Sequence, residues 1–203
     1  MNIALSYTLS VFLCIVLTAC EGRDNPLNPI NPTPTLAYRI RLQIKDAPGH
    51  FESIRIGGQF DVRNADQCGR IRRATGTTGR ISRSLDLPLA RISDSEYEAV
   101  LHLDKMLDGD HFGRGDCHWQ LSVAYAEILP QDHEKDASFE ISMDAQDVVT
   151  GGSVTRYYPS ALYREPKGFA GARMVGSDRP DNYLPGVRDH LFSLTLSSVG
   201  ESE

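Results

Sequence analysis

Residues 36–45 read LAYRIRLQIK, and the alternation of apolar and polar side chains in this stretch decides the fold. One face carries only apolar residues, and the other includes two arginines, a glutamine and a lysine. Successive side chains of a β-strand point to opposite faces, so a period of two is typical of a strand with one buried face. The stretch therefore predicts a half-buried strand.

The same period of two recurs along the chain. It appears at residues 53–62, 84–89, 97–103, 119–125, 139–143 and 192–197. Pro88 cannot donate a ladder hydrogen bond, so residues 84–89 predict an edge strand. No segment beyond the N-terminal region carries the apolar stripe of an amphipathic helix over three turns. Short strands without crossover helices predict an all-β fold, an antiparallel β-sandwich of about 7–9 strands.

The composition suits a globular protein that does not bind nucleic acid. The chain has 203 residues, of which 40% are hydrophobic and 24% charged, and its formal net charge is −6. This length fits one domain with extensions, and the composition argues against disorder. Nucleic-acid-binding proteins usually present a basic field, so we expect no nucleic-acid partner.

The N-terminal residues predict export and lipidation. Residues 1–19 hold no Asp, Glu, Lys or Arg, and VFLCIVL at 11–17 fits a signal-peptide core. The run ends in Leu17-Thr18-Ala19-Cys20, which resembles the lipobox of bacterial lipoproteins. That resemblance implies a diacylglyceryl thioether on Cys20, cleavage before it, and acylation, as with palmitate, of the new N-terminus. An uncleaved membrane anchor is the alternative, and it also places the rest of the chain outside the cytoplasm.

We expect a lipid-anchored protein of the cell envelope whose domain faces the periplasm. Stable anchoring needs more than one acyl chain, at ~0.8 kcal/mol for each buried CH₂. Residue 21 is Glu rather than Asp. By resemblance to enterobacterial sorting, this favours the outer membrane over the inner membrane.

A proline-rich stretch follows the lipobox. Pro26, Pro29 and Pro32 recur at every third position, and Pro34 follows. Proline favours extended backbone, and a period of three matches polyproline II. Fifteen such residues would reach ~45 Å. We therefore predict a signal peptide at 1–19, a semi-rigid tether outside the fold at 20–35 and the sandwich at 36–203. An irregular linker with accidental proline spacing is the alternative to a stiff tether.

Cysteine usage predicts one disulfide. Of four cysteines, Cys14 leaves with the signal peptide and Cys20 is the lipid site, which leaves Cys68 and Cys117. Exported proteins meet oxidising conditions, so we expect these two to pair. Closing a loop of ~50 residues is worth about 4 kcal/mol in the chain-entropy model. A catalytic thiol would need a nearby base, and the chain has no Cys-His signature.

The loop between the strands at 97–103 and 119–125 is the candidate metal site. Its carboxylates, which could bind Ca²⁺, are those of Asp108, Asp110 and Asp116. The spacing differs from that of an EF-hand, and Asp-Gly is common turn chemistry. The candidate zinc ligands His102, His111 and His118 are irregularly spaced. We therefore expect neither metal nor cofactor, and we expect Trp119 to pack against the disulfide rather than stack on a ligand.

Residues 156–189, the Tyr/Arg segment, predict a partner-binding surface. Tyrosine and arginine are enriched at binding hot spots, and long loops in compact domains are often functional. The predicted partner-binding residues are Tyr157, Tyr158, Tyr163, Arg164, Arg173 and Tyr183. The alternative is a loop that packs its tyrosines on its own sheet.

These features predict a protein-binding module without catalytic activity. The chain has no Gly-x-Ser-x-Gly, His-Glu-x-x-His, Walker or dinucleotide-binding motif. Its architecture of anchor, tether and one stapled β domain is similar to immunity lipoproteins of antibacterial secretion systems, which implies a periplasmic effector as partner. A structural or assembly lipoprotein of an envelope machine is the first alternative. A cell-wall enzyme or carbohydrate-binding module is the second, and it would need paired carboxylates in a cleft or an exposed aromatic platform.

Overall fold

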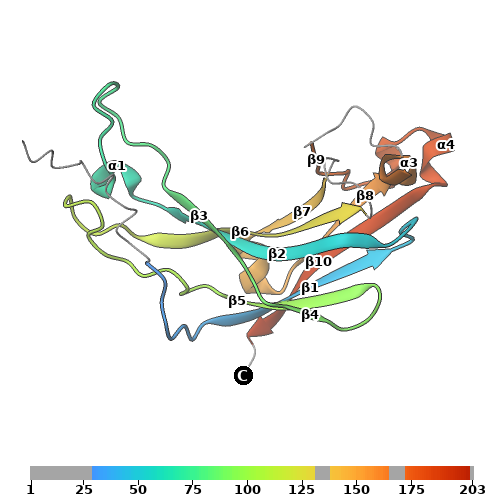
Figure 1. The fold of residues 1–203 in the computed structure, drawn as a ribbon, viewed down its shortest axis with the longest axis horizontal. Helices are drawn as coiled ribbons and strands as arrows, with labels where there is room; N and C mark the ends of the chain where they lie inside the picture. The colour runs from blue at the N-terminus through green and yellow to red at the C-terminus, as the bar shows by residue number, and fades with distance from the viewer. Residues whose placement is uncertain (1–28, 131–137, 165–171, 202–203) are drawn as a thin grey trace, which may run out of the picture.

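A computed structural model describes residues 29–130, 138–164 and 172–201. Within these residues, ten strands form two five-stranded sheets that pack as a β-sandwich (Figure 1), which confirms the predicted fold class. The first sheet has the order β4-β5-β1-β10-β8 and the second the order β3-β2-β6-β7-β9. The pairings are antiparallel except for that of β7 with β9. The predicted signal peptide and the predicted lipidation site, Cys20, lie outside the described residues.

The strands of each sheet come from both halves of the chain. The first sheet contains β4 (Leu89–Arg91), β5 (Glu96–His102), β1 (Ala37–Lys45), β10 (Leu191–Glu201) and β8 (Ser153–Pro159). The second contains β3 (Ser82–Asp86), β2 (Phe51–Val62), β6 (Trp119–Pro130), β7 (Ser138–Asp144) and β9 (Arg173–Met174). The short helices are α1 (Ala65–Cys68), α2 (Ala145–Thr150), α3 (Ser160–Arg164), η1 (Pro180–Asn182) and α4 (Pro185–Arg188). In the described part of the chain no helix could cross a bilayer, since the longest, α2, has six residues.

Strand β1 shows how the sequence pattern builds the core. Ile40 and Leu42 are fully buried between the sheets, as the alternation predicts. On the outer face, Arg39 and Arg41 both pair with Glu98 of the neighbouring β5, with N···O distances of 3.1 Å. Burial of the apolar face stabilises the sandwich by ~25 cal/mol per Å² removed from water, whereas exposed ion pairs add little.

The predicted strand at 84–89 is divided between the two sheets. β3 pairs with β2 in the second sheet, whereas β4 pairs with β5 in the first. Pro88 lies between them and interrupts the ladder because it lacks an amide proton. Both halves are edge strands, which confirms that part of the prediction.

Residues 29–35, the second part of the predicted tether, pack on the domain. Ile30 forms an antiparallel bridge with Met106, and the Leu107 amide donates to the Pro29 carbonyl at 2.6 Å. Pro29 is buried, and Ile30 packs against the core. The prediction that this stretch lies outside the fold is wrong, since proline removes a donor but leaves its carbonyl free to accept.

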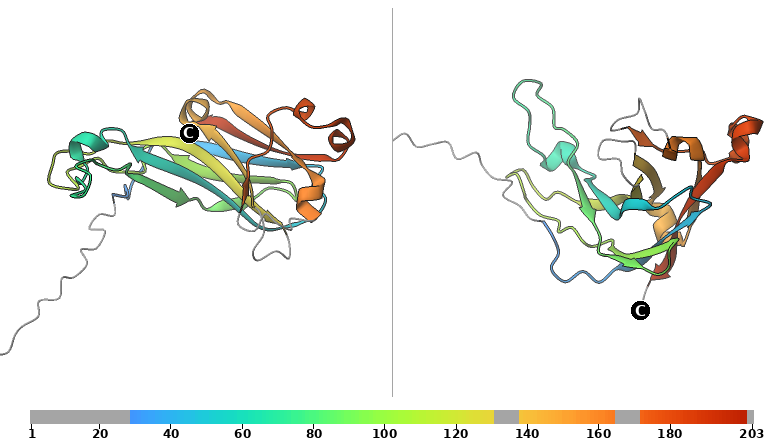
Figure 2. Two further views of the ribbon diagram at one scale, coloured as in Figure 1. Left: turned by 90° about the horizontal axis from the view of Figure 1, so that it is seen from above. Right: turned by 45° about the vertical axis from the view of Figure 1, so that its right-hand side comes forward.

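The sandwich has two ends that differ in character. We call residues 29–36, 63–81 and 104–119 the proximal end, and residues 153–164 and 172–190 the distal end. Figures 1 and 2 show α1 at one extreme of the long axis and α3 and α4 at the other. Each end carries one of the sequence features singled out above: the disulfide is proximal, and the Tyr/Arg segment is distal.

Candidate functional site

Tyr158 is a core residue, and the prediction that it contacts a partner is wrong. The residue is 0% exposed, and its ring stacks on Phe192 with the centroids 5.2 Å apart. The hydroxyl donates to the Glu140 carbonyl at 2.7 Å, which ties β8 to β7 of the other sheet. Burial raises the pKa of Tyr158. Residues 156–189 were predicted to be a loop, whereas β8 is a strand that directs Tyr158 into the core.

Tyr163 and Tyr183 also use their hydroxyls to support the fold. The Tyr163 ring meets Phe51 edge to face at 5.4 Å, and its hydroxyl donates to the His50 carbonyl. The Tyr183 hydroxyl donates to the Tyr157 carbonyl at 2.7 Å, and burial raises the pKa of Tyr183. Tyr157 itself is half-buried. The tyrosines thus pack on their own sheet, which was the alternative interpretation.

The two predicted arginines have different outcomes. The side chain of Arg164 lies outside the described residues. Arg173 is 70% exposed at its side chain, and its guanidinium lies 3.3 Å from the Glu140 carboxylate. Arg173 and Glu140 both line a trough of about 390 Å³ on the outer face of the second sheet.

Arginine also holds the other carboxylates of this trough. Arg55 forms ion pairs with Asp86 and Glu127. The Tyr125 hydroxyl donates to Asp86 at 3.2 Å. The Asp86 and Glu127 carboxylates thus share one guanidinium, and we interpret the trough as a charge-paired surface.

The distal end exposes two large apolar side chains among its charged residues. Leu184 is 76% exposed and Val175 is 62% exposed. The turns that carry them are joined, since the side-chain Nδ2 of Asn182 donates to the Ser177 hydroxyl at 2.8 Å. These two exposed side chains therefore belong to one connected loop cluster.

Gly176 explains how that cluster rests on the aromatic core. Its φ of +61° is one that other residues rarely adopt, and a Cβ would lie 2.7 Å from both the Tyr158 ring and the Tyr157 carbonyl. Arg188 fixes the neighbouring turn by donating to the Tyr183 carbonyl at 2.9 Å. The exposed leucine and valine are therefore carried by turns with little freedom to move.

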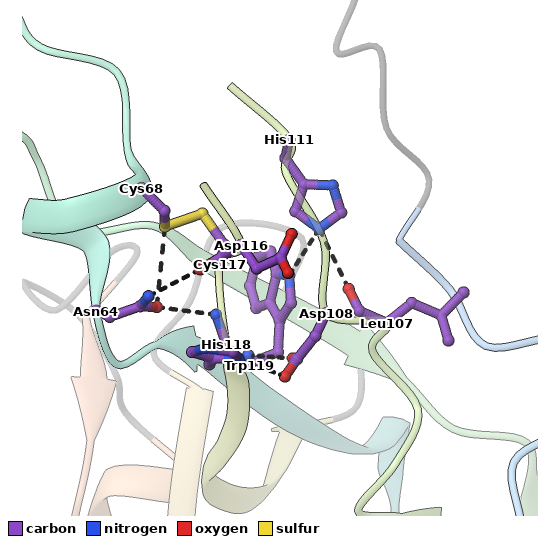
Figure 3. A network of polar contacts seen from close by, with 9 residues as sticks. All are labelled: Asn64, Cys68, Leu107, Asp108, His111, Asp116, Cys117, His118 and Trp119. Atoms are coloured by element: carbon purple, nitrogen blue, oxygen red, sulfur yellow. Dashed lines mark hydrogen bonds and ion pairs between the residues drawn. A yellow bond between two sulfur atoms is a disulfide. The ribbon is translucent and has the colours of Figure 1, made fainter. Parts of the chain in front are cut away.

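The proximal end contains the predicted disulfide. Cys68 of α1 and Cys117, just before β6, are bonded, with a Cα–Cα distance of 5.3 Å (Figure 3). Both are buried and form a small cluster with Val62, against which Phe112 and Trp119 pack. The predicted packing of Trp119 against the disulfide is confirmed.

Polar contacts reinforce the disulfide (Figure 3). The Asn64 side chain donates to the Asp116 carbonyl and accepts from the His118 amide, each at 2.8 Å. Cys68 Sγ lies 3.8 Å from Asn64 Oδ1, which is contact only, because a disulfide sulfur carries no proton. The Arg114 guanidinium donates to the Gly69 carbonyl. The two loops are therefore held by covalent, amide and guanidinium contacts together.

The aspartates of the candidate metal loop hold separate pieces of backbone. Asp108 accepts from the Trp119 amide at 2.8 Å and lies 2.7 Å from His118 Nδ1. Asp110 accepts from the Arg114 amide at 2.9 Å, which holds the Asp110 pKa below its usual range. Across the described ranges, no three His, Cys, Asp or Glu side chains are grouped to hold a metal.

The His118–Asp108 pair resembles half of an acid–base catalytic arrangement. Both side chains are exposed, by 40% and 49%. Among the described residues, no hydroxyl or thiol forms a hydrogen bond with His118. A nucleophile within reach is what such a pair would need for covalent catalysis, so we interpret it as a loop contact.

Asp104 holds the end of the tether. Its carboxylate accepts from the amides of Thr35 at 2.8 Å and Leu36 at 3.1 Å. Burial alone would raise the pKa of Asp104, but these hydrogen bonds outweigh it and hold that pKa below its usual range. Pro29 lines a cavity of about 200 Å³ together with Ile81, so the chain enters the domain beside residues 63–81.

Residues 63–81 form an arginine-rich segment, the arginine arm, which was not among the predicted binding surfaces. Residues 67–85 contain five arginines and no Asp or Glu, although the whole chain has a net charge of −6. Four exposed guanidinium groups have no carboxylate partner among the described residues, and they belong to Arg63, Arg70, Arg72 and Arg73. A run of arginine without acid, in an acidic chain, was the signal that could have revealed this surface.

Asp61 is an acid that pairs with one arginine of the arm. Arg80 pairs with Asp61 on the outer face of β2. Burial alone would raise the pKa of Asp61, but hydrogen bonds from Arg80, Ser122 and Ser82 outweigh it and hold the pKa well below its usual range. Arg80 is therefore neutralised locally, unlike the arginines nearer the tip of the arm.

Comparison with protein-family models, curated proteins and solved structures gives no match for this chain.

Proposed function

We propose that the chain is a lipid-anchored envelope protein that binds a protein partner through its distal end and performs no catalysis. The observation that carries the proposal is the exposure of Leu184 and Val175, at 76% and 62%, on turns fixed to the aromatic core. Preordered apolar side chains lose little conformational freedom on binding, so they suit the centre of an interface. We therefore propose Leu184 and Val175, and not the tyrosines, as the partner-binding residues.

The position of the tether supports this assignment. The chain enters the domain at Pro29, at the proximal end, whereas α3 and α4 of the distal end lie at the opposite extreme of the long axis (Figure 1). Nine residue steps separate Cys20 from Pro29, and they can span at most ~32 Å at ~3.6 Å each. A binding surface at the far end of the sandwich gains the length of the domain as additional reach.

The architectural resemblance to immunity lipoproteins suggests which protein is bound. We propose that the partner is an antibacterial effector that reaches the periplasm. An inhibitor of such an effector needs an anchored scaffold and an exposed, rigid face. The assembly-lipoprotein alternative shares these needs, and the identity of the captured partner distinguishes the two.

The anchor is tested by Cys20→Ala. We expect this variant to lose the acyl mass on its N-terminal peptide and to leave the membrane fraction. Wild-type protein without acyl mass, together with unchanged fractionation of the variant, would contradict the anchor.

The binding surface is tested by Leu184→Ser with Val175→Ser. We expect capture of the partner from envelope extracts to fall at least tenfold, because apolar anchors of a hot spot contribute ≥2 kcal/mol each, while the melting temperature stays unchanged. The matched control is Leu107→Ser with Val149→Ser, which removes apolar residues that are 43% and 49% exposed elsewhere. Equal capture by the two double variants would refute the distal surface.

The effector assignment has its own test. A strain lacking the gene should become sensitive to a competitor that delivers the effector, and the wild-type gene should restore resistance. The distal double variant should not restore it, whereas the control double variant should. Capture of an envelope-assembly subunit without any change in sensitivity would favour the assembly alternative.

The absence of catalysis is also a proposal. We expect the purified mature chain to leave peptidoglycan, lipid and peptide substrates intact. Hydrolysis that disappears with Glu127→Gln, in the trough, or with His118→Gln, in the loop pair, would overturn it.

A further inference from the structure

The arginine arm is a cationic surface on an acidic protein. Its four unpartnered guanidinium groups lie within residues 63–73, and the nearest acid in that stretch is Asp66. Several arginines of the sheets pair with acids, as Arg39 does with Glu98 at 3.1 Å and Arg91 with Asp94 at 2.7 Å. Leaving several like charges adjacent and unpaired is unfavourable for folding, so a ligand of opposite charge would explain their retention.

The arm is also well supported at its base. The Cys68–Cys117 disulfide and the Arg114 contact to the Gly69 carbonyl fix where it leaves the sandwich. Beyond them the arm closes as a hairpin, with Ile71 bridged to Thr78. Figures 1 and 2 show this hairpin projecting from the end of the sheets. The charged tip is thus presented to solvent by a stapled scaffold.

The arm presents an apolar side chain together with cationic ones. Ile71 is 46% exposed between Arg70 and Arg72. Arginine forms bidentate hydrogen bonds to phosphate oxygens, and its planar group is weakly hydrated. An exposed isoleucine flanked by arginines can enter the boundary between headgroups and acyl chains while the guanidinium groups stay at the phosphates.

The tether determines what the arm faces. Pro29 lines the same cavity as Ile81 of the arm and Phe112. The nine residue steps from Cys20 to Pro29 can span no more than ~32 Å. If Cys20 is embedded through its lipid, Pro29, which lies beside Ile81 at the base of the arm, stays within that distance of the membrane surface. An anionic protein would have to approach from that same, crowded side.

We propose that the arginine arm binds the anionic lipid headgroups of the membrane that holds the Cys20 lipid. The inference rests on the anchor proposed above and adds a second contact to it. A lipid with an adjacent basic patch gives a two-point attachment, which fixes orientation as well as location. With the arm on the membrane, Leu184 and Val175 at the opposite end face the periplasm.

The test uses the mature chain, residues 20–203, with Cys20→Ser, so that the lipid contributes nothing. Binding is measured by co-sedimentation with phosphatidylethanolamine vesicles that contain about 30% phosphatidylglycerol, and with vesicles that contain phosphatidylcholine instead. The arm variant is Arg70→Gln, Arg72→Gln and Arg73→Gln. The matched control removes three arginines from the first sheet: Arg39→Gln, Arg91→Gln and Arg156→Gln.

We expect binding to the anionic vesicles only, and weaker binding as salt rises above about 0.1 M. Each arginine near an anionic surface contributes about fivefold, so the arm variant should bind on the order of 100-fold more weakly. The control variant, with the same loss of charge, should change binding less than tenfold.

Four outcomes would overturn the inference. The first two are equal binding to both vesicle types and no binding to either. The third is an equal loss of vesicle binding in the two triple variants. The fourth is that the arm variant loses binding to an acidic protein but keeps its binding to anionic vesicles. Because the lipid is absent throughout, none of these depends on whether Cys20 is acylated. Lipidation is decided separately by the mass of the native N-terminal peptide.

Discussion

The two ends of the sandwich hold their loops by different kinds of contact. At the distal end, the rings of Phe139 and Tyr158 meet Phe192 with centroids 5.0 and 5.2 Å away, and the loops rest on this aromatic core. At the proximal end, the described residues form a separate small buried cluster of Val62, Cys68 and Cys117, the last two joined by the disulfide. Where the core is small, a covalent bond and side-chain contacts to backbone replace apolar burial.

The comparison shows that the type of a residue does not by itself determine its role in this molecule. The tyrosines, which binding surfaces favour, are used at the distal end to build the core. The arginines are divided: Arg188 clamps a distal turn, whereas Arg72 and Arg73 of the arm have no partner among the described residues. A residue type enriched in interfaces therefore indicates a surface only when its polar group is left unused by the fold.

The largest effect that tests this comparison is expected from Tyr158→Ala. Removing a fully buried aromatic side chain leaves a cavity, and we expect the free energy of unfolding to fall by about 3–5 kcal/mol in urea denaturation. Tyr157→Ala is the matched control at the next position of β8, and it should cost less than half as much because Tyr157 is half-buried. Equal losses in the two variants would mean that the distal end does not depend on its aromatic core.

A slightly smaller effect is expected from Cys68→Ala with Cys117→Ala. The disulfide joins residues 49 apart, and its loss should lower the free energy of unfolding by about 4 kcal/mol in the chain-entropy model. Hydrogen exchange should increase most in the arginine arm and least around Phe192, because the contacts of the distal end are intact. Uniform loss of protection along the chain would show that the two ends are not held independently.

The sequence predicted the sheets better than the ends. The strand at β1 was predictable because Ile40 and Leu42 alternate with charged residues, a pattern that depends only on local geometry. The disulfide was predictable by counting cysteines. β8 was missed because its residues lack a clean alternation: only Tyr158 is fully buried, and the two preceding positions on that face are partly exposed. Its pairing with β10 depends on contacts distant in sequence.

The proposed binding surfaces could not be predicted for a related reason. Whether a tyrosine binds a partner or fills a core is decided by the element opposite it, here Phe192 for Tyr158. The docking of residues 29–35 depends on Asp104, which lies 69 residues from Thr35. Composition alone suggested a free tether, because the acceptor that holds it is supplied by a distant loop.

The smallest effect concerns that docking, through Asp104→Asn and acid titration. The pKa of Asp104 is lowered in the folded protein by hydrogen bonds from Thr35 and Leu36, so the stability it contributes is present above the unfolded pKa near ~4. That contribution is lost as pH falls through the lower, folded pKa, because the protonated carboxyl accepts these amides more weakly. We expect the Thr35 and Leu36 amide resonances to shift below about pH 4, and Asp104→Asn to show weakened protection of both amides already at neutral pH.

The stability change itself should be under about 1 kcal/mol, since the contacts are exposed. The control is Asp94→Asn, which removes a 94% exposed carboxylate in the β4–β5 turn and should leave both amides unchanged. If the Thr35 and Leu36 resonances do not respond to acid or to Asp104→Asn, the carboxylate does not hold the tether. The difference between the two ends would then rest on the disulfide alone, and the proposed membrane contact of the arm would lose the fixed entry point beside Pro29 on which it depends.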